Sequence, residues 1–169
     1  MQHTVTQLMD LSRVDSGEVE LNIEPVSLEE IIQQIWSRHE STAVERKLQV
    51  DLGAIEAAVW EVDRSLFERI LDNLIENAVH YATEGGQVSL GISDDQKTLS
   101  VRNDCEGLTE EDLEKLFHRF WRKDSARSSS LHRGLGLSVA SAFAQCLGMR
   151  LDPRLEDESV FEMKLSRDV

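Results

Sequence analysis

Polar side chains recur in one stretch of the sequence that otherwise has the apolar pattern of a buried helix. Asn73 and Asn77 are four positions apart, and His80 follows about one turn later. Residues with this spacing share one face of a helix. Asparagine is a poor helix former, and its amide oxygen is a hard ligand suited to Mg²⁺. The spacing therefore fits a face that binds a metal, and it also fits the solvated stripe of an amphipathic helix.

Two glycines, Gly134 and Gly136, open another predicted helix, and a basic segment precedes them. Glycine lets backbone N–H groups approach a phosphate closely, and a helix N-terminus favours an anion. Residues 115–133 hold six Lys or Arg residues and one acidic residue, in a chain whose net charge is −14. Three of these side chains suit bidentate contacts with phosphate oxygens: Arg122, Arg127 and Arg133. A plain glycine-rich helix entry after a solvated loop would have the same features.

A third polar group, Asn103–Gly107, follows a predicted strand. A polar side chain at the end of a strand can read the edge of a nucleotide base by hydrogen bonding. An ordinary turn between a strand and a helix has a similar composition.

A mixture of helices and strands must position these groups. Apolar spacing and capping residues predict helices at 4–17, 28–45, 109–120 and 135–147. A further helix is predicted to begin after the N-cap residue Asp63 and to end before the break at 83–86. Alternating patterns predict strands at 19–23, 47–52, 57–62, 87–94, 97–103, 149–155 and 159–165. Residues 121–133 have no apolar period and are predicted to form a mobile loop. This order favours an α+β fold with helices packed on one face of a mixed sheet.

Composition narrows the class of protein. The chain has 169 residues, of which 40% are hydrophobic and 30% charged, as in one globular domain with or without a short appendage. No run approaches the roughly 18 apolar residues of a membrane span, and the start lacks the features of a secretory signal, so we expect a soluble, unexported chain. The acidic balance argues against broad binding to nucleic acid or anionic membranes. Cys105 and Cys146 have no metal-binding spacing and indicate reduced thiols.

Four strings in order carry a resemblance to a known family: LSRVDSG (11–17), DRSLFERILDNLIENAVHYA (63–82), LFHRFWRKDSAR (116–127) and GLGLSVASAFA (134–144). Together they resemble the ATP-binding catalytic module of sensor histidine kinases, in the GHKL superfamily, over about residues 8–166. Four motifs in order are far more specific than any one of them. The resemblance implies a two-layer α/β sandwich, with a mixed sheet covered on one face by helices and ATP bound between the helices and a mobile lid.

The resemblance also implies roles for single residues. Asn77 would coordinate an Mg²⁺ ion that bridges the ATP phosphates, Asn73 would be a polar catalytic helper, and Arg122 would contact the γ-phosphate. The lid would run from about 119 to 133, with Phe117 and Phe120 beside it, although core packing explains these two aromatic residues equally well. The other positions implied to bind nucleotide are His80, Tyr81, Asn103, Gly107, Arg127, Gly134, Leu135, Gly136 and Leu137.

The resemblance also implies domain boundaries in the chain and the partners that it acts with. Residues 1–17 resemble the end of the dimerisation and phospho-acceptor hairpin, and residues 18–169 the ATP-binding kinase domain. The family's acceptor motif, of His-Glu-Leu-Arg-Thr-Pro type, does not occur here. We therefore expect a monomer that transfers phosphate from ATP to a histidine supplied by another domain, and that indirectly serves a response regulator. We expect no nucleic-acid partner and a cytoplasmic location, including the cytoplasmic part of a membrane-anchored sensor.

The sequence departs from the family pattern Asp-x-Gly-x-Gly, whose Asp accepts a hydrogen bond from the adenine amino group. Asn103 stands at the Asp, Cys105 at the first Gly and Gly107 at the second. Asparagine keeps a carbonyl acceptor but loses charge assistance, which weakens adenine binding by about 1 kcal/mol. Asp104 would substitute only if the strand bulges.

These departures leave two alternatives to the kinase hypothesis. One is a degenerate module that binds nucleotide weakly and acts through protein contacts. The other is a GHKL ATPase or a serine kinase of the anti-sigma type, which the LSRVDSG string disfavours.

Overall fold

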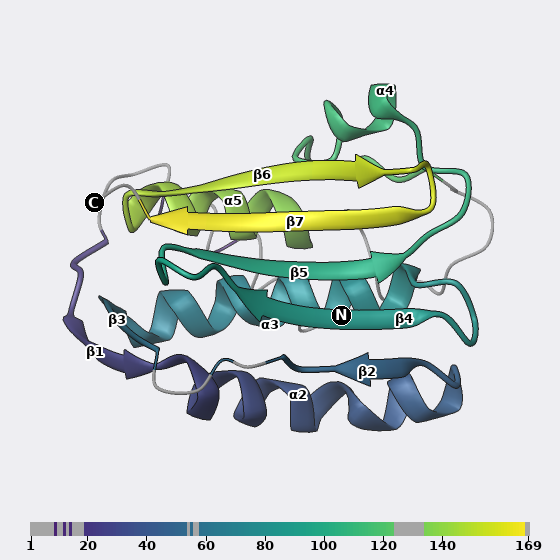
Figure 1. The fold of residues 1–169 in the computed structure, drawn as a ribbon. Coiled ribbons are helices and arrows are strands. Elements are labelled where there is room, and N and C mark those ends of the chain that lie inside the picture. The colour runs from purple at the N-terminus through teal and green to yellow at the C-terminus, as the bar shows by residue number, and fades with distance from the viewer. Residues whose placement is uncertain are drawn as a thin grey trace.

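Three helices lie on one side of a sheet (Figure 1). The computed structural model describes Met9, Ser12, Val14, residues 19–53, Ile55, and residues 58–123 and 134–167. The three helices are α2 (Leu28–Glu45), α3 (Arg64–Tyr81) and α5 (Gly136–Cys146). They form one layer and the sheet forms the other, which confirms the predicted α+β sandwich.

The main sheet has five strands in the order β2-β4-β5-β7-β6. These are β2 (Gln49–Asp51), β4 (Gln87–Ile92), β5 (Thr98–Asp104), β6 (Met149–Glu156) and β7 (Val160–Arg167). Strand β2 runs parallel to β4 and the other pairs are antiparallel, so the sheet is mixed. Two further strands, β1 (Ile23–Ser27) and β3 (Val59–Asp63), pair with each other in a separate antiparallel ribbon.

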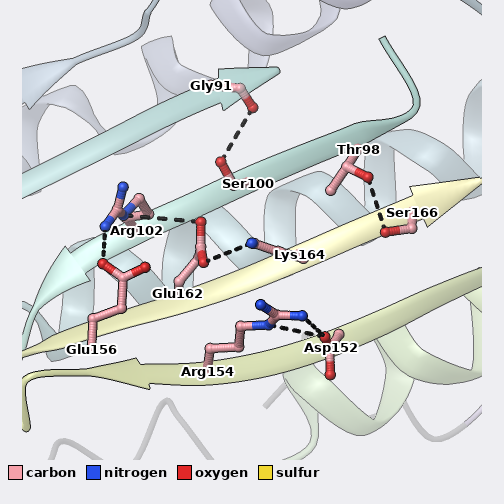
Figure 2. Close-up of polar contacts among 10 residues, drawn as sticks. All are labelled: Gly91, Thr98, Ser100, Arg102, Asp152, Arg154, Glu156, Glu162, Lys164 and Ser166. Carbon is pink, nitrogen blue, oxygen red and sulfur yellow. Dashed lines mark hydrogen bonds and ion pairs between the residues drawn. The ribbon is translucent and has the colours of Figure 1, made fainter. Parts of the chain in front are cut away.

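The two faces of the sheet differ in polarity, which explains why helices cover only one of them. Along β5, Leu99, Val101 and Asn103 are buried and alternate with partly exposed polar residues. Figure 2 shows that charged side chains pair across the other face, among them Arg102 with Glu156. A further ion pair joins Lys164 Nζ to Glu162 Oε2 at 3.3 Å. Such a face is stable in water, whereas the apolar face needs the helices.

The sequence between Asp63 and Ala82 folds into α3 as the apolar spacing predicts. All eight apolar residues assigned to its inner face are buried: Leu66, Phe67, Ile70, Leu71, Leu74, Ile75, Ala78 and Val79. The Asp63 carboxylate caps the helix by accepting a hydrogen bond from Leu66 N at 3.0 Å. It also accepts hydrogen bonds from Ser65 Oγ at 2.7 Å and from Asn22 N at 2.9 Å. Asp63 therefore joins the N-terminal segment to the helix that carries the two asparagines.

The helix predicted for residues 109–120 is wrong in length. Helix α4 spans only Glu110–Leu113 and is followed by turns. Phe120 has a φ of +67°, outside the right-handed helical region, and its N–H donates to Gly134 O at 2.9 Å. This long-range bond fixes where the chain turns, and local sequence does not encode it.

Two predicted segments fall largely outside the described residues. Within the predicted helix at 4–17, Met9, Ser12 and Val14 are helical, and Val14 packs against the core. Of the predicted lid, only 119–123 is described. Across the described part of the chain, no helix combines the length and the apolar character that a membrane crossing needs.

We expect Asp63→Ala to lower the free energy of unfolding by about 1–3 kcal/mol at pH 7, because it removes the cap and leaves buried donors unpaired. Burial alone would raise the pKa of Asp63, but hydrogen bonds led by the one from Asn22 N bring it below its ordinary value of 3.8. A lowered pKa in the folded state stabilises the fold above pH 4, and that stabilisation is lost as the pH falls through the folded-state pKa. Urea titrations should therefore show the difference from wild type narrowing below pH 4. An equal difference at pH 3 and pH 7 would contradict this role.

Candidate functional site

The polar stripe of α3 runs along the edge of its buried face. Asn73 and Asn77 are both partly exposed, one turn apart. The Asn73 side chain is held by its own helix, because Nδ2 donates to Arg69 O at 2.7 Å. At the end of the helix the His80 and Tyr81 rings meet edge to face at 5.0 Å, and Tyr81 is 47% exposed. The helix therefore presents amide, imidazole and phenol groups along one line.

Helix α5 approaches this stripe closely at Gly136. A Cβ at Gly136 would lie 2.8 Å from Asn73 Oδ1, so only glycine fits without displacing the asparagine. Farther along α5, the Phe143 ring lies 5.8 Å below the Arg69 guanidinium. The numbering of the two helices runs in opposite directions through these contacts, so α5 is antiparallel to α3. Its N-terminus therefore points along α3 toward Asn77.

The N-terminus of α5 has no side-chain cap. Leu135 occupies the N-cap position with φ −107° and ψ −23°, and it cannot accept the first helical N–H groups. The Ser138 hydroxyl donates instead to Leu135 O at 2.8 Å. Leu135 and Leu137 are buried and fix the turn to the core. The first N–H groups of α5, beside Asn73, have no acceptor within the helix, and helix ends of this kind bind anions in other proteins.

Arg122 lies beside the same turn. Two of its guanidinium nitrogens, Nε and Nη2, are buried and have no hydrogen-bond partner within the described part of the chain. Gly134 has a φ of +70°, and a Cβ there would lie 2.5 Å from Trp121 O and 3.2 Å from Arg122 Cγ. A buried cation without a partner is costly, so this arrangement favours a bound anion at the turn.

Asn103 marks the other end of the site. It is 2% exposed, and its Oδ1 has no hydrogen-bond partner among the described residues. Its Nδ2 donates to Asp104 O at 3.0 Å, and that same carbonyl accepts a hydrogen bond from Thr83 N at 3.0 Å. Asn103 therefore lies beside the turn that follows α3.

Asp104 does not take over from Asn103. Strand β5 pairs regularly with β7 through Asp104 and Val160, without a bulge. The Asp104 carboxylate accepts a hydrogen bond from Gln87 N at 2.8 Å, which commits it to holding β4. Beside it, Cys105 is buried, and burial raises the pKa of its thiol. The residue at the first glycine position of the pattern is thus a protonated, largely inaccessible thiol.

The structure places most of the predicted residues on α3 or beside it. Arg122 and the turn at Gly134–Leu137 lie near Asn73, and Asn103 lies at the other end. Gly107 follows β5 at a φ of +71° with open space around it. Phe117 is half-buried against the core and Phe120 is 60% exposed. Arg127 and Arg133 lie outside the described residues.

Sequence reasoning missed two residues that shape this site. Arg69 holds Asn73 from one turn earlier, and spacing of four would have pointed to it. Thr83 contacts the strand end through its backbone, which leaves no signal in the sequence. A separate cavity of about 510 Å³ between α4 and β6 has acidic walls; Phe117 lines it, but none of the residues predicted to bind nucleotide or metal does.

Comparison with known proteins settles the family. The model of a family described as histidine kinase-, DNA gyrase B-, and HSP90-like ATPase matches residues 62–168. The chain belongs to this family. Sensor histidine kinase WalK of Bacillus subtilis (strain 168) is 32% identical over 154 residues, which cover 88% of this chain and 25% of WalK. Sensor histidine kinase MtrB of Mycolicibacterium paratuberculosis is 34% identical over 152 residues, which cover 88% of this chain and 27% of MtrB. The chain therefore spans about a quarter of the length of these curated relatives.

Solved structures of histidine kinases have a similar fold. The Acinetobacter baumannii histidine kinase AdeS superposes with a TM-score of 0.75 at 25% identity, over 99% of this chain and 79% of that one. Full-length ShkA in complex with AMPPNP shares the fold, with a TM-score of 0.81 at 22% identity, over 96% of this chain and 34% of ShkA. These findings confirm the predicted family and fold, and they show that the chain is similar to one part of sensor histidine kinases.

The close contact between α3 and α5 at Gly136 leads to a prediction about stability. We expect Gly136→Ala to lower the free energy of unfolding by about 1–3 kcal/mol, because its Cβ displaces the Asn73 amide. Adding Asn73→Ala removes the obstacle, so the double variant should lose less than the sum of the single variants. Denaturant titration of all three measures the coupling. Gly91→Ala is the matched control, since its nearest neighbour is Ser100 Oγ at 3.8 Å. If the losses in the free energy of unfolding of the two single variants add up to that of the double variant, the helices adjust to the new Cβ without strain.

Proposed function

We propose that this domain binds ATP together with Mg²⁺ and transfers the γ-phosphate to a histidine in a separate dimerisation and phospho-acceptor domain. The observation that carries this proposal is the Arg122 guanidinium beside the uncapped start of α5, because its Nε and Nη2 atoms are buried without a hydrogen-bond partner among the described residues. A cation and free N–H groups at one turn match the charge and the acceptor oxygens of a triphosphate. The similarity of the chain to sensor histidine kinases supports the same reaction.

The nucleotide lies along α3 in this proposal. Asn103 takes the base at one end, with Tyr81 beside it, and the phosphates reach the turn at Gly134 and Gly136. His80 and Asn77 lie between, and Asn77 offers its amide oxygen to Mg²⁺. Among the described residues no group of three or more His, Cys, Asp or Glu side chains could hold a metal, so phosphate oxygens and water would complete the coordination. Bound Mg²⁺ supplies neutralisation of charge on the phosphates.

The transfer needs little covalent help from the protein. A neutral imidazole nitrogen of the acceptor attacks the γ-phosphorus, the bond to the bridging oxygen of ADP breaks, and the imidazole proton leaves to water. Arg122 and the N–H groups of α5 stabilise the charge on the phosphoryl oxygens. An amide takes up no proton at neutral pH, so Asn73 acts by holding α5 and the turn in place. Arg127, in the predicted lid, is a further candidate for phosphate contact.

The domain division and the partners belong to the same proposal. Residues 1–17 are the end of the hairpin that carries the acceptor in the kinases, and 18–169 are the catalytic domain. The module works in the cytoplasm, and the phosphorylated acceptor then supplies a response regulator. A degenerate module is the second candidate, because Cys105 is buried where the family pattern has glycine.

Calorimetric titration tests the nucleotide site. We expect micromolar binding of a non-hydrolysable ATP analogue that weakens in EDTA. Arg122→Met removes the cation and should weaken nucleotide binding at least tenfold. Arg150→Met removes an exposed arginine of β6 and should leave nucleotide binding unchanged. Asn77→Ala should remove the dependence on Mg²⁺. Absence of binding at millimolar concentrations would favour the degenerate module.

Phosphotransfer tests the reaction class. We expect labelled phosphate to move from ATP to an added acceptor-histidine fragment, as a label that acid removes and base preserves, because the phosphorus is bound to nitrogen. Arg122→Met should slow the transfer, and a fragment with the acceptor His replaced should take no label. An acid-stable label would point to a serine kinase instead.

A further inference from the structure

Hydrogen bonds do not hold the buried part of the Arg122 guanidinium in place. Its Nε and Nη2 atoms have no acceptor within the described part of the chain. Their position therefore depends on the backbone of Arg122 and on the packing of its aliphatic stem. The stem lies beside the turn at Gly134, where a Cβ would be 3.2 Å from Arg122 Cγ. Whatever fixes the backbone on either side of Arg122 thus also fixes the cation at the proposed phosphate site.

The backbone before Arg122 is tied to the turn at Gly134. Phe120 N donates to Gly134 O at 2.9 Å. Gly134 also packs against this segment, because a Cβ there would lie 2.5 Å from Trp121 O. Among the described residues, neither Arg122 nor Lys123 takes part in a backbone–backbone hydrogen bond. The chain after Trp121 therefore needs another anchor.

The Lys123 side chain supplies that anchor. Its ammonium group forms an ion pair with the Asp112 carboxylate of α4, and the two side chains are 33% and 16% exposed. The same carboxylate oxygen, Oδ2, accepts from Thr109 N at 3.0 Å and from Thr109 Oγ1 at 2.9 Å. Leu113, the next residue of α4, is buried in the core. The Asp112 carboxylate is therefore a fixed point, and a partly buried pair is less screened by salt than a surface pair.

The ion pair is present at neutral pH. Hydrogen bonds led by the one from Lys123 Nζ hold the pKa of Asp112 below its ordinary value of 3.8, so its carboxylate is charged. The pair joins residues 11 positions apart, across the turns that follow α4. It thus anchors the chain on the side of Arg122 where the described residues show no backbone hydrogen bond.

We propose that Asp112 is a positioning residue for Arg122: its ion pair with Lys123 fixes the backbone after Arg122 and so determines how tightly the site holds the terminal phosphate. This inference rests on the proposed function and adds a residue that acts on the nucleotide only through Arg122. Removal of a negative charge near an anion would by itself tighten binding. Positioning predicts the opposite sign, because an Arg122 that is no longer held loses its contact with the phosphate oxygens.

ATP and ADP, each with Mg²⁺, differ only by the terminal phosphate, so calorimetric affinities of the full chain for both test this proposal. We expect Asp112→Asn to lower the ratio of ATP to ADP affinity about threefold to tenfold. The asparagine oxygen can still accept from Thr109, so α4 keeps its cap. Glu111→Gln is the matched control, because it removes the same charge from an exposed position of α4. Glu111 has no ion pair among the described residues, so its variant should not lower the ratio.

Variants of Arg122 and Lys123 test whether Asp112 acts through them. Once Arg122→Met has removed the cation, adding Asp112→Asn should not lower the ratio further. Lys123→Arg keeps the ion pair and should keep the wild-type ratio, whereas Lys123→Met should lower it as Asp112→Asn does. Lys115→Met removes an exposed cation nearby and controls for the loss of positive charge. If Asp112→Asn does not fold, as circular dichroism would show, Lys123→Met leaves the α4 cap intact and still decides.

The outcomes separate this inference from the proposed function. A ratio that rises or stays unchanged in Asp112→Asn, while Arg122→Met lowers it, would overturn the inference alone. An equal fall of the ratio with and without Arg122 would also overturn it, since the effect would not pass through that residue. Failure of the wild-type chain to bind ATP would overturn the proposed function and this inference together.

Discussion

The close approach of α5 to α3 at Gly136 is the constraint on which the rest of the site depends. Asn73 is tied to its own helix through Arg69 O, so its Oδ1 is a fixed obstacle that leaves room only for a glycine. Because the two helices are antiparallel there, the uncapped start of α5 and the preceding turn lie along the polar stripe of α3. Arg122 lies beside this turn, since a Cβ at Gly134 would be 3.2 Å from Arg122 Cγ. The close contact between Gly136 and Asn73 thus brings together the polar stripe of α3, the start of α5 and Arg122, which are separated in the sequence.

The fold follows from local sequence where burial and capping decide the outcome. The eight apolar positions of α3, its Asp63 cap and the hairpin of β4 and β5 all agree with expectation, because each depends on neighbours close in sequence. The length of α4 does not, since the bond between Phe120 N and Gly134 O joins residues far apart along the chain. The separate pairing of β1 with β3 is non-local in the same sense, and local periodicity contains no information about it.

The candidate site shows the same division. The types and spacing of Asn73, Asn77 and Arg122 were sufficient to select them, because their chemistry is visible in the sequence. What the sequence could not supply is how each amide is held. The side chains of Asn73 and Asn103 donate to the backbone carbonyls of Arg69 and Asp104, and a backbone group has no residue type to reveal it.

Unsatisfied polar groups at two places in the site destabilise the folded chain when no ligand is bound. Within the described part of the chain, Arg122 Nε and Nη2 are buried donors without an acceptor, and Asn103 Oδ1 is a buried acceptor without a donor. Each such group destabilises the fold by about 1–3 kcal/mol when it is unsatisfied. A nucleotide that supplies an anion at one end and an amino group at the other removes both costs at once. Ligand at a hundred times its dissociation constant adds about 2.7 kcal/mol to the free energy of unfolding, which is comparable to the two costs. In the proposed site, the groups assigned to nucleotide binding are therefore the same groups that limit the stability of the empty domain.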